Sequence, residues 1–508
     1  MRLLTAVVFL AASQQAGCVR TGPDMPAFTD DPGSAFSFPT ATLPIPTPTQ
    51  SYQLPTPRPA GETFQAPTPD APHYQPVSAS GPQTYVVQSG DFLSAIAERY
   101  SLPVAALIEA NGIFNPDALE VGQVLTIPVL PPQPTGPAYK LVPDSELVYG
   151  PNSRLDVAAF VQERGGYLAS FTQNVNGEQL SGAQIVQRVA GSYSVNPRLL
   201  LALLEYRSGW VTNPGIDPAT DDMPLGFYDG WYNGLYRQMV WAANALNGGY
   251  YAWRYGLVTS WVLSDGSVVP VEPTINAGTA GIQYAFALLD DYPAWLRDVS
   301  PGGFFDTYFM LFGQPFDYSV EPLVPSPLVQ PELWLPFNPG EVWAFTGGPH
   351  ASWDSGSPYG ALDFAPPGEA LGCVPDDHWI TAVADGLVVR TGEGVVALDL
   401  DMDGLEQTGW VIVYMHIEQR ERVLPGTRLR AGDPLGHASC EGGVSSGTHV
   451  HITRKFNGEW IPVMGSTPFT MSGWLAAGTG EEYVGSLSRD GRVVESFEGN
   501  SSINQVSR

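Results

Sequence analysis

Hydrophobic and polar residues follow two different patterns in the two largest parts of the chain. Residues 141–324 have helical periodicity, and the apolar run from Leu199 to Leu204 lies in the clearest of these segments. Residues 340–475 instead alternate apolar and polar side chains, as strands do, in the segments 379–384, 386–390, 411–416 and 448–453. The patterns predict a multidomain protein with a mostly helical middle region and a mainly antiparallel β region after it.

A third, shorter unit precedes the helical region. Residues 85–91 indicate a strand and a turn, 93–100 and 104–111 two amphipathic helices, and 124–127 a returning strand. We therefore expect a small βααβ domain over residues 84–129. Proline-rich segments separate the units and predict a tether at 19–83 and linkers at 130–140 and 325–339. Residues 476–508 contain no recognisable chemistry and are expected to form a C-terminal tail.

Residues 1–18 have the features of an export signal. Arg2 is followed by an apolar run over residues 3–12, which is too short to span a bilayer, and by Ala16, Gly17 and Cys18. This ending resembles a bacterial lipoprotein signal, which implies lipidation of Cys18, although Gln15 departs from the family pattern. Ordinary signal-peptidase cleavage is the alternative. Both predict an extracytoplasmic protein, either lipid-anchored or secreted, and we expect no membrane contact other than the lipid anchor.

The charge balance limits the possible partners. The 508-residue chain has 23 Lys and Arg against 51 Asp and Glu, which gives a formal net charge of −28. Phosphate backbones would repel such a chain, so we expect no nucleic-acid partner.

The βααβ unit resembles a lysin-motif (LysM) domain. The resemblance rests on Gly90-Asp91, on Asn111-Gly112 and on the ending Val-Gly-Gln-Val-Leu-Thr-Ile-Pro at 121–128. Phe92 stands where the family usually has Thr. The resemblance implies binding of glycans that contain N-acetylglucosamine, with a LysM fold kept only as a spacer as the alternative.

The helical region resembles a lysozyme-like lytic transglycosylase that has lost its acid. Arg207 occupies the position of the catalytic Glu, and Glu205 would face about 200° away on the helix. We therefore expect no glycosidase activity and a structural role for Glu205. The region is also rich in aromatic residues between 227 and 255, which predict core packing or, alternatively, non-catalytic glycan binding.

Histidines in the β region indicate a metal site. In Gly447-Thr-His449-Val-His451 the period of a strand places both imidazoles on one face. Two convergent histidines suit a divalent metal, but catalytic Zn²⁺ typically takes three nitrogen or oxygen ligands. Further candidates are His350 in Gly347-Gly-Pro-His350 and the later Asp363.

These motifs resemble the beta-lytic branch of the lysostaphin-like zinc endopeptidases. The commoner branch has its first His four residues before the Asp, where this chain has Tyr359. The resemblance implies that Zn²⁺ is bound by His350, Asp363 and His451. It also implies that His416 and His449 stand beside the metal as catalytic residues, without assigning the general base. Structural histidines are the alternative.

Two further features of this region have alternative interpretations. Cys373 and Cys440 are expected to form a disulfide, and the alternative is a Cys metal ligand that would close the site. The segment from Asp399 to Gly404 imitates the start of a calcium loop, but Trp410 stands at its twelfth position, which favours a solvated acidic hairpin.

Together these features predict a secreted or lipid-anchored zinc endopeptidase that hydrolyses peptide cross-links of peptidoglycan. LysM would target it to the glycan. The alternative is a non-catalytic cell-wall-binding or hydrolase-activating protein with a metallopeptidase fold.

Overall fold

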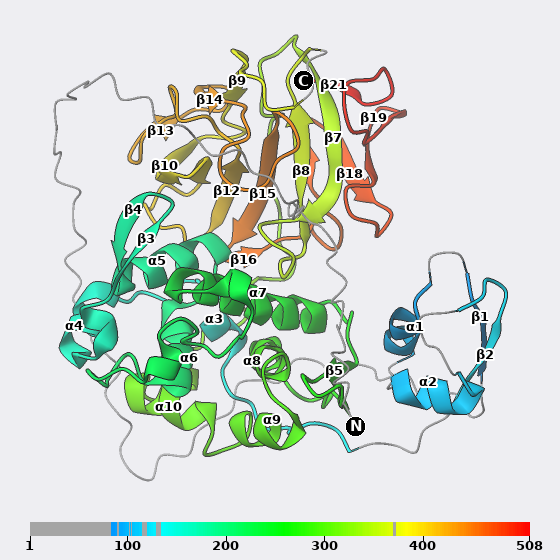
Figure 1. Ribbon diagram of the computed structural model, residues 1–508. Helices are drawn as coiled ribbons and strands as arrows, with labels where there is room; N and C mark the ends of the chain where they lie inside the picture. The colour runs from blue at the N-terminus through cyan, green and yellow to red at the C-terminus, as the bar shows by residue number, and fades with distance from the viewer. Residues whose placement is uncertain are drawn as a thin grey trace, which may run out of the picture.

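The computed structural model describes residues 83–88, 91–100, 102, 104–113, 119–128, 134–368 and 372–508 (Figure 1). The expected signal peptide with Cys18, the tether up to residue 82, Gly90 and the linker prolines 131 and 132 lie outside the described residues. Within these ranges, no helix is both long and apolar enough to cross a membrane.

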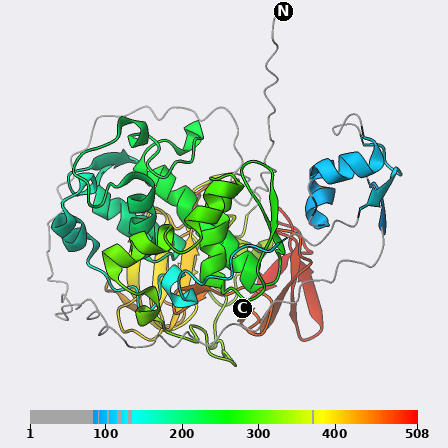
Figure 2. The ribbon, with the colours of Figure 1, turned by 90° about the horizontal axis from the view of Figure 1, so that it is seen from below.

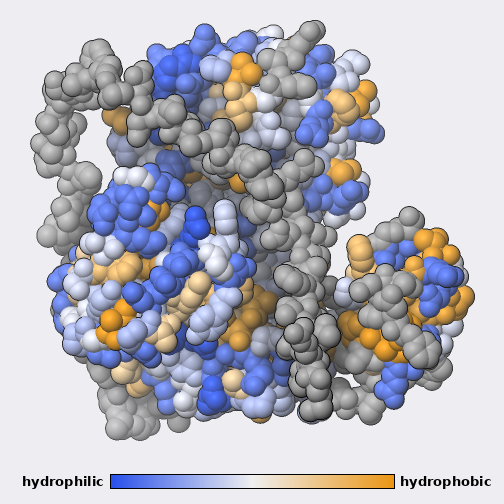
Figure 3. All heavy atoms as spheres, in the orientation of Figure 1, coloured by the Kyte–Doolittle hydropathy of each residue, from blue (hydrophilic) through white to orange (hydrophobic). Residues whose placement is uncertain are grey.

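The small unit at residues 83–128 has the expected βααβ order. Its elements are β1 (Gln83–Val86), α1 (Leu93–Arg99), α2 (Val104–Asn111) and β2 (Val124–Ile127), and the two strands pair antiparallel. The Asn111 side chain accepts from the Thr126 amide and donates to the Thr126 carbonyl, so it ties α2 to β2. Apolar side chains gather over this unit in Figure 3, and Phe92 is 70% exposed.

The middle region is mostly helical, as the periodicity predicts. Its α-helices are α3 (Asp144–Leu147), α4 (Val157–Arg164), α5 (Gly182–Tyr193), α6 (Pro197–Ser208), α7 (Leu235–Arg254), α8 (Ala277–Ala287), α9 (Tyr292–Asp298) and α10 (Phe304–Phe312). Short 3-10 turns are η1 (Tyr167–Ala169), η2 (Pro218–Thr220), η3 (Gly230–Tyr232) and η4 (Pro315–Tyr318), and the hairpins are β3 (Thr172–Val175) with β4 (Glu178–Ser181) and β5 (Ser260–Val262) with β6 (Val268–Pro270). Local sequence fixes several ends: Ser181 and Gln184 form a capping box at α5, and Gly209 ends α6 in the left-handed conformation.

The C-terminal region is built on antiparallel sheets. Its strands are β7 (Val342–Ala351), β8 (Tyr359–Ala365), β9 (Trp379–Thr381), β10 (Gly386–Gly392), β11 (Val395–Asp399), β12 (Trp410–Met415), β13 (Arg428–Leu429), β14 (Pro434–His437), β15 (Val450–Phe456), β16 (Glu459–Trp460), β17 (Thr470–Met471), β18 (Trp474–Gly478), β19 (Gly485–Arg489), β20 (Arg492–Glu495) and β21 (Gln505–Ser507). Among the described residues the largest sheet has nine strands, in the order β13-β10-β11-β12-β15-β8-β7-β21 with β16 beside β15.

The two faces of this sheet pack into different cores. On β12, Ile412 and Tyr414 join a core within the C-terminal region, whereas Val411, Val413 and Met415 join the buried cluster of the helical region. The helices therefore cover one face of the sheet, and Figure 2 shows them lying across it. The helical and β regions share a hydrophobic core.

Two expected boundaries differ from the structure. Residues 476–508 are not a separate tail, because β18 to β20 form a sheet and β21 pairs with β7. The expected linker at 325–339 also contributes to the β core, where Leu333, Leu335 and Phe337 are at most 2% exposed. Both segments are positioned by pairing or packing with residues far away in the sequence. A local sequence pattern gives little indication of such contacts.

Candidate metal centre

The register of two neighbouring strands brings Asp363 and His451 together. Asp363 on β8 lies directly opposite His451 on β15. Their neighbours Leu362, Phe364, Val450 and Ile452 all enter the β core. Because side chains alternate along a strand, Asp363 and His451 point to the opposite face, which the helical region covers.

The strand β7 supplies His350 to the same place. His350 Nε2 lies 2.9 Å from His451 Nδ1 and 3.3 Å from Asp363 Oδ1. His451 Nδ1 is also 3.3 Å from Asp363 Oδ1. The three side chains, each at most 8% exposed, thus offer one atom each to a common point.

Two glycines before His350 make this approach possible. A Cβ on Gly347 would overlap the Asp363 carboxylate, and a Cβ on Gly348 would overlap the backbone of residues 483–485. The Gly-Gly-Pro-His sequence therefore fits a strand that is in close contact on both sides.

Hydrogen bonds to backbone carbonyls orient the two candidate ligand histidines. His350 Nδ1 lies 2.8 Å from the Gly348 carbonyl, and His451 Nε2 lies 3.0 Å from the Ser352 carbonyl. Since a carbonyl oxygen only accepts, these ring nitrogens carry the protons. In their neutral forms His350 Nε2 and His451 Nδ1 present lone pairs to each other. Burial lowers the pKa of His350, but Asp363 outweighs it and raises the pKa, so a proton or a bound cation is favoured between the two nitrogens.

His416 and His449 lie beside the three candidate ligands, and a backbone carbonyl holds each of their rings as well. His416 Nδ1 donates to the Glu441 carbonyl at 2.9 Å, and His449 Nδ1 donates to the Gly447 carbonyl at 2.7 Å. The Nε2 atoms of both rings are buried and have no hydrogen-bond partner among the described residues. β15 begins at Val450, so His449 immediately precedes the strand on which the sequence pattern placed it. Its Nε2 is still only 3.7 Å from Asp363 Oδ1.

The electrostatics of the cluster follow from burial and one carboxylate. Burial favours a neutral Asp363, but His350 and His449 outweigh it and hold the pKa of this carboxyl well below its usual range. Burial, together with His449 and His451, holds the pKa of His416 well below that of a free imidazole. The centre therefore combines an anionic carboxylate with at least one neutral imidazole.

The donor set fits a small divalent ion. Four ligands at about 2.0 to 2.1 Å around a tetrahedral Zn²⁺ lie roughly 3.3 Å from one another. The three donor atoms found here are separated by 2.9 and 3.3 Å. Asp363 Oδ1 is buried without a hydrogen-bond partner among the residues described, which an ion would satisfy.

A disulfide and the C-terminal segment support the centre. Cys373 and Cys440 form a disulfide, so neither sulfur is a free ligand. The carbonyl of Glu441, which follows Cys440, accepts the hydrogen bond from His416.

Tyr483 of the C-terminal segment stacks on His350 with ring centroids 4.3 Å apart. Sequence analysis missed Tyr483 because it follows the motifs by some thirty residues, within the expected tail.

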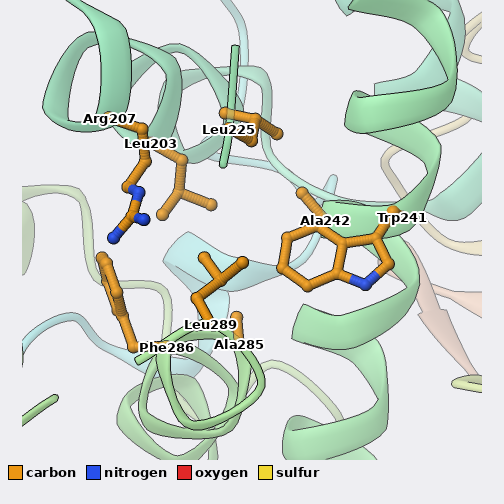
Figure 4. Close-up of a pocket in the computed structure, with 8 residues that line it drawn as sticks. All are labelled: Leu203, Arg207, Leu225, Trp241, Ala242, Ala285, Phe286 and Leu289. Atoms are coloured by element: carbon orange, nitrogen blue, oxygen red, sulfur yellow. The ribbon is translucent and has the colours of Figure 1, made fainter. Parts of the chain in front are cut away.

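The candidates in the helical region have structural surroundings. Glu205 accepts from the backbone amides of Val211 and Thr212 and from the Thr212 hydroxyl, so its carboxylate holds the turn after α6. Arg207 pairs with Asp290 at 3.1 Å. It borders a small apolar pocket, shown in Figure 4, whose other lining residues are Leu203, Leu225, Trp241, Ala242, Ala285, Phe286 and Leu289.

The aromatic residues of this region divide into two groups. Trp241, Tyr250, Tyr251 and Trp253 are buried in the shared core. Tyr228 and Trp231 are 79% and 60% exposed.

The acidic loop after β11 is held by hydrogen bonds between its own residues. Asp399 accepts from the amides of Asp401, Met402 and Gly404. Burial and the neighbouring carboxylates raise the pKa of Asp399 to about 7. Although Asp399, Asp401 and Asp403 lie close together, backbone amides supply the hydrogen bonds that hold this turn.

Comparison with known proteins identifies two of the modules. Residues 85–128 match the LysM domain family, and residues 140–324 match the family described as "LasA, N-terminal domain". The chain is 25% identical to Protease LasA of Pseudomonas aeruginosa over 310 residues, which cover 56% of this chain and 68% of the relative. It is 28% identical to beta-lytic metalloendopeptidase of Lysobacter enzymogenes over 159 residues, or 31% and 85% of the two chains.

Among solved structures, the M23 metalloprotease pseudoalterin is 24% identical, with 35% of this chain and 99% of that chain covered and a TM-score of 0.29. The sequence likenesses confirm the expected resemblance to LysM proteins and beta-lytic metalloendopeptidases. The chain joins a LysM domain to a region that is similar to beta-lytic metalloendopeptidase.

Proposed function

We propose that this protein is a zinc-dependent endopeptidase that hydrolyses peptide cross-links of peptidoglycan. The observation that carries the proposal is the meeting of His350 Nε2, Asp363 Oδ1 and His451 Nδ1. Two of their separations equal the roughly 3.3 Å edge of a zinc tetrahedron, and the third, between the two histidines, is shorter at 2.9 Å. With both rings neutral, the two facing nitrogens are acceptors, and an ion bound between them would account for their 2.9 Å approach. The likeness to Protease LasA and to beta-lytic metalloendopeptidase supports the same reaction.

His350, Asp363 and His451 would hold the ion. A bound Zn²⁺ supplies Lewis acidity, which polarises a scissile carbonyl and lowers the pKa of a coordinated water. The carbonyls of Gly348 and Ser352 accept the far ring protons, so they fix the ring tautomers that the ion requires. Three protein ligands leave room for water and substrate, as in other catalytic zinc sites.

His416 and His449 would accept and donate protons during hydrolysis. Each ring is held through Nδ1 by a backbone carbonyl, and its buried Nε2 has no hydrogen-bond partner among the residues that the structure describes. A neutral imidazole in this state can accept a proton from a nucleophilic water, and the resulting imidazolium can donate one to the leaving amine. His449 is 13% exposed and lies nearer to solvent, whereas His416 is 1% exposed. We therefore assign contact with the substrate first to His449.

The LysM domain would bring the centre to its substrate. We propose that it binds peptidoglycan glycan that contains N-acetylglucosamine, and that the chain acts outside the cytoplasm, secreted or held by a lipid on Cys18. Its match to the LysM family supports the glycan target. The net charge of −28 argues against nucleic-acid partners.

Metal analysis combined with a wall-clearing assay tests the proposal. We expect about one Zn²⁺ per chain, and loss of turbidity when the purified protein is added to isolated peptidoglycan. A chelator should abolish clearing, and added Zn²⁺ should restore it. A protein that binds no metal and is inert on peptidoglycan from several sources would instead support the non-catalytic alternative.

A further inference from the structure

We propose that Tyr193 and Asn244 of the helical region are positioning residues for the metal centre. Both side chains form hydrogen bonds to the loop of residues 352–358, and this loop orients the ring of His451. The inference rests on the proposed function, because it assigns a task to these two residues at that same centre.

The first contact lies between the loop and His451. The Ser352 carbonyl accepts from His451 Nε2 at 3.0 Å and so keeps Nδ1 free for a metal. Ser352 is itself fixed across the loop, because its amide and hydroxyl donate to the Pro358 carbonyl at 3.0 and 3.1 Å. Movement of the loop would therefore turn or release the His451 ring.

The second contact joins the same loop to α7 of the helical region. Asn244 Nδ2 donates to Ser355 Oγ at 2.9 Å, and Asn244 Oδ1 accepts from the Gly356 amide at 2.7 Å. Gly356 is pressed so closely on α7 that a Cβ there would overlap the Asn244 carbonyl. One side chain from the helical region thus provides both a donor and an acceptor to the tip of the loop.

The third contact comes from the end of α5. The Tyr193 hydroxyl donates to Asp354 Oδ2 at 3.0 Å, and its ring lies edge-on to Trp353 with centroids 6.2 Å apart. Tyr193 has little freedom to move, because it is 8% exposed and its carbonyl accepts from Asn247 at 2.8 Å. The loop therefore rests against a rigid part of the shared core.

These contacts link the helical region to His451 through the backbone of the loop, because Tyr193 and Asn244 bind residues 353–356 and the adjoining Ser352 binds His451. The three proposed ligands lie on three strands, β7, β8 and β15, and the loop contacts one of them through the hydrogen bond to His451. Residues that support a metal ligand in this indirect way typically alter metal affinity without touching the ion. The helical region thus contributes to the geometry of a centre to which it supplies no ligand.

Conservative variants test the proposal with two readouts that do not depend on turnover. Tyr193→Phe removes only the hydroxyl, and Asn244→Ala removes both of its loop contacts. We expect each to weaken Zn²⁺ binding on the order of 2- to 10-fold, measured by chelator competition. In the metal-free full chain, we expect faster backbone amide exchange in residues 352–357. Tyr206→Phe is the matched control, because it loses a 2.9 Å hydroxyl bond to Asp298 without contacting the loop.

A double-mutant cycle separates this role from general destabilisation. Asp354→Asn keeps an acceptor for the Tyr193 hydroxyl and should retain wild-type affinity for Zn²⁺. Asp354→Ala removes the acceptor and should weaken Zn²⁺ binding, and its effect should not add to that of Tyr193→Phe. Unchanged affinity and exchange in folded Tyr193→Phe and Asn244→Ala would overturn the positioning role. If the wild-type chain bound no Zn²⁺, the proposed function would fail, while the exchange measurement would still decide whether these residues hold the loop.

Discussion

His350 Nε2 and His451 Nδ1 lie 2.9 Å apart although 101 positions separate the two residues in the sequence. Each ring donates from its other nitrogen to a backbone carbonyl, so in the neutral rings the two facing atoms are both acceptors. This pairing, with Asp363 at 3.3 Å from both, is the feature on which a metal-dependent activity depends.

Substitution of the two histidines around Val450 should separate metal binding from catalysis. His451→Ala removes a ligand and should lose both zinc and peptidoglycan hydrolysis. His449→Ala should keep zinc but lose activity by about 100-fold or more, the range typical of a proton-transfer residue. Metal content and turbidity clearing measure the two effects. His378→Ala, outside the centre, is the control, and full turnover in His449→Ala would contradict these roles.

Gly347→Ala should damage the centre through the Asp363 carboxylate. A methyl group there overlaps this side chain, which must move away from His350 and His451. We expect at least tenfold weaker Zn²⁺ binding and a matching loss of activity, in line with displaced metal ligands. Gly230→Ala is a suitable control because a Cβ at that position meets no atom within 4 Å. Wild-type affinity in Gly347→Ala would show that the site adapts without loss.

Loss of the disulfide should affect catalysis more than metal content. The bond closes a separation of 67 residues and is worth about 4 kcal/mol in the chain-entropy estimate. It anchors Cys440 next to Glu441, whose carbonyl holds His416. The double variant Cys373→Ser/Cys440→Ser should therefore unfold at lower urea concentration and hydrolyse more slowly while it still binds zinc. Loss of zinc in a folded variant would mean that the disulfide supports the ligands directly.

Acid should weaken the fold through Glu406. Burial alone would raise the pKa of this carboxyl, but Arg390 and Lys455 outweigh it and lower the pKa to about 2. Because the folded pKa lies below the ordinary value of about 4.5, the ion pairs stabilise the fold above that pH. This contribution is lost as pH falls from about 4.5 to about 2.

The pH dependence can be measured by urea unfolding between pH 2 and 6. Glu406→Gln should be less stable than wild type at pH 6, and the difference should shrink as the pH falls through this window. The exposed carboxylate variant Glu495→Gln should follow wild type throughout. A constant difference between Glu406→Gln and wild type would exclude titration of Glu406 as the cause.

The sequence by itself determined the local structure and the residue types of the site. Alternating positions predict β12 and β15, helical periodicity predicts α6, and the βααβ order of the LysM unit agrees with the observed elements. These features depend on neighbours within a few residues, so their signal is present in the linear pattern. The motifs around His350, Asp363 and His451 likewise named the side chains that the fold brings together.

Only the tertiary structure decided how the segments combine. It placed residues 476–508 against β7, buried Leu333 in the β core, and joined the helical and β regions in a shared core. It also brought Tyr483 onto His350 and Tyr193 onto the loop beside His451. Such contacts join residues more than a hundred positions apart. They arise from the packing of whole faces, which no short stretch of sequence specifies.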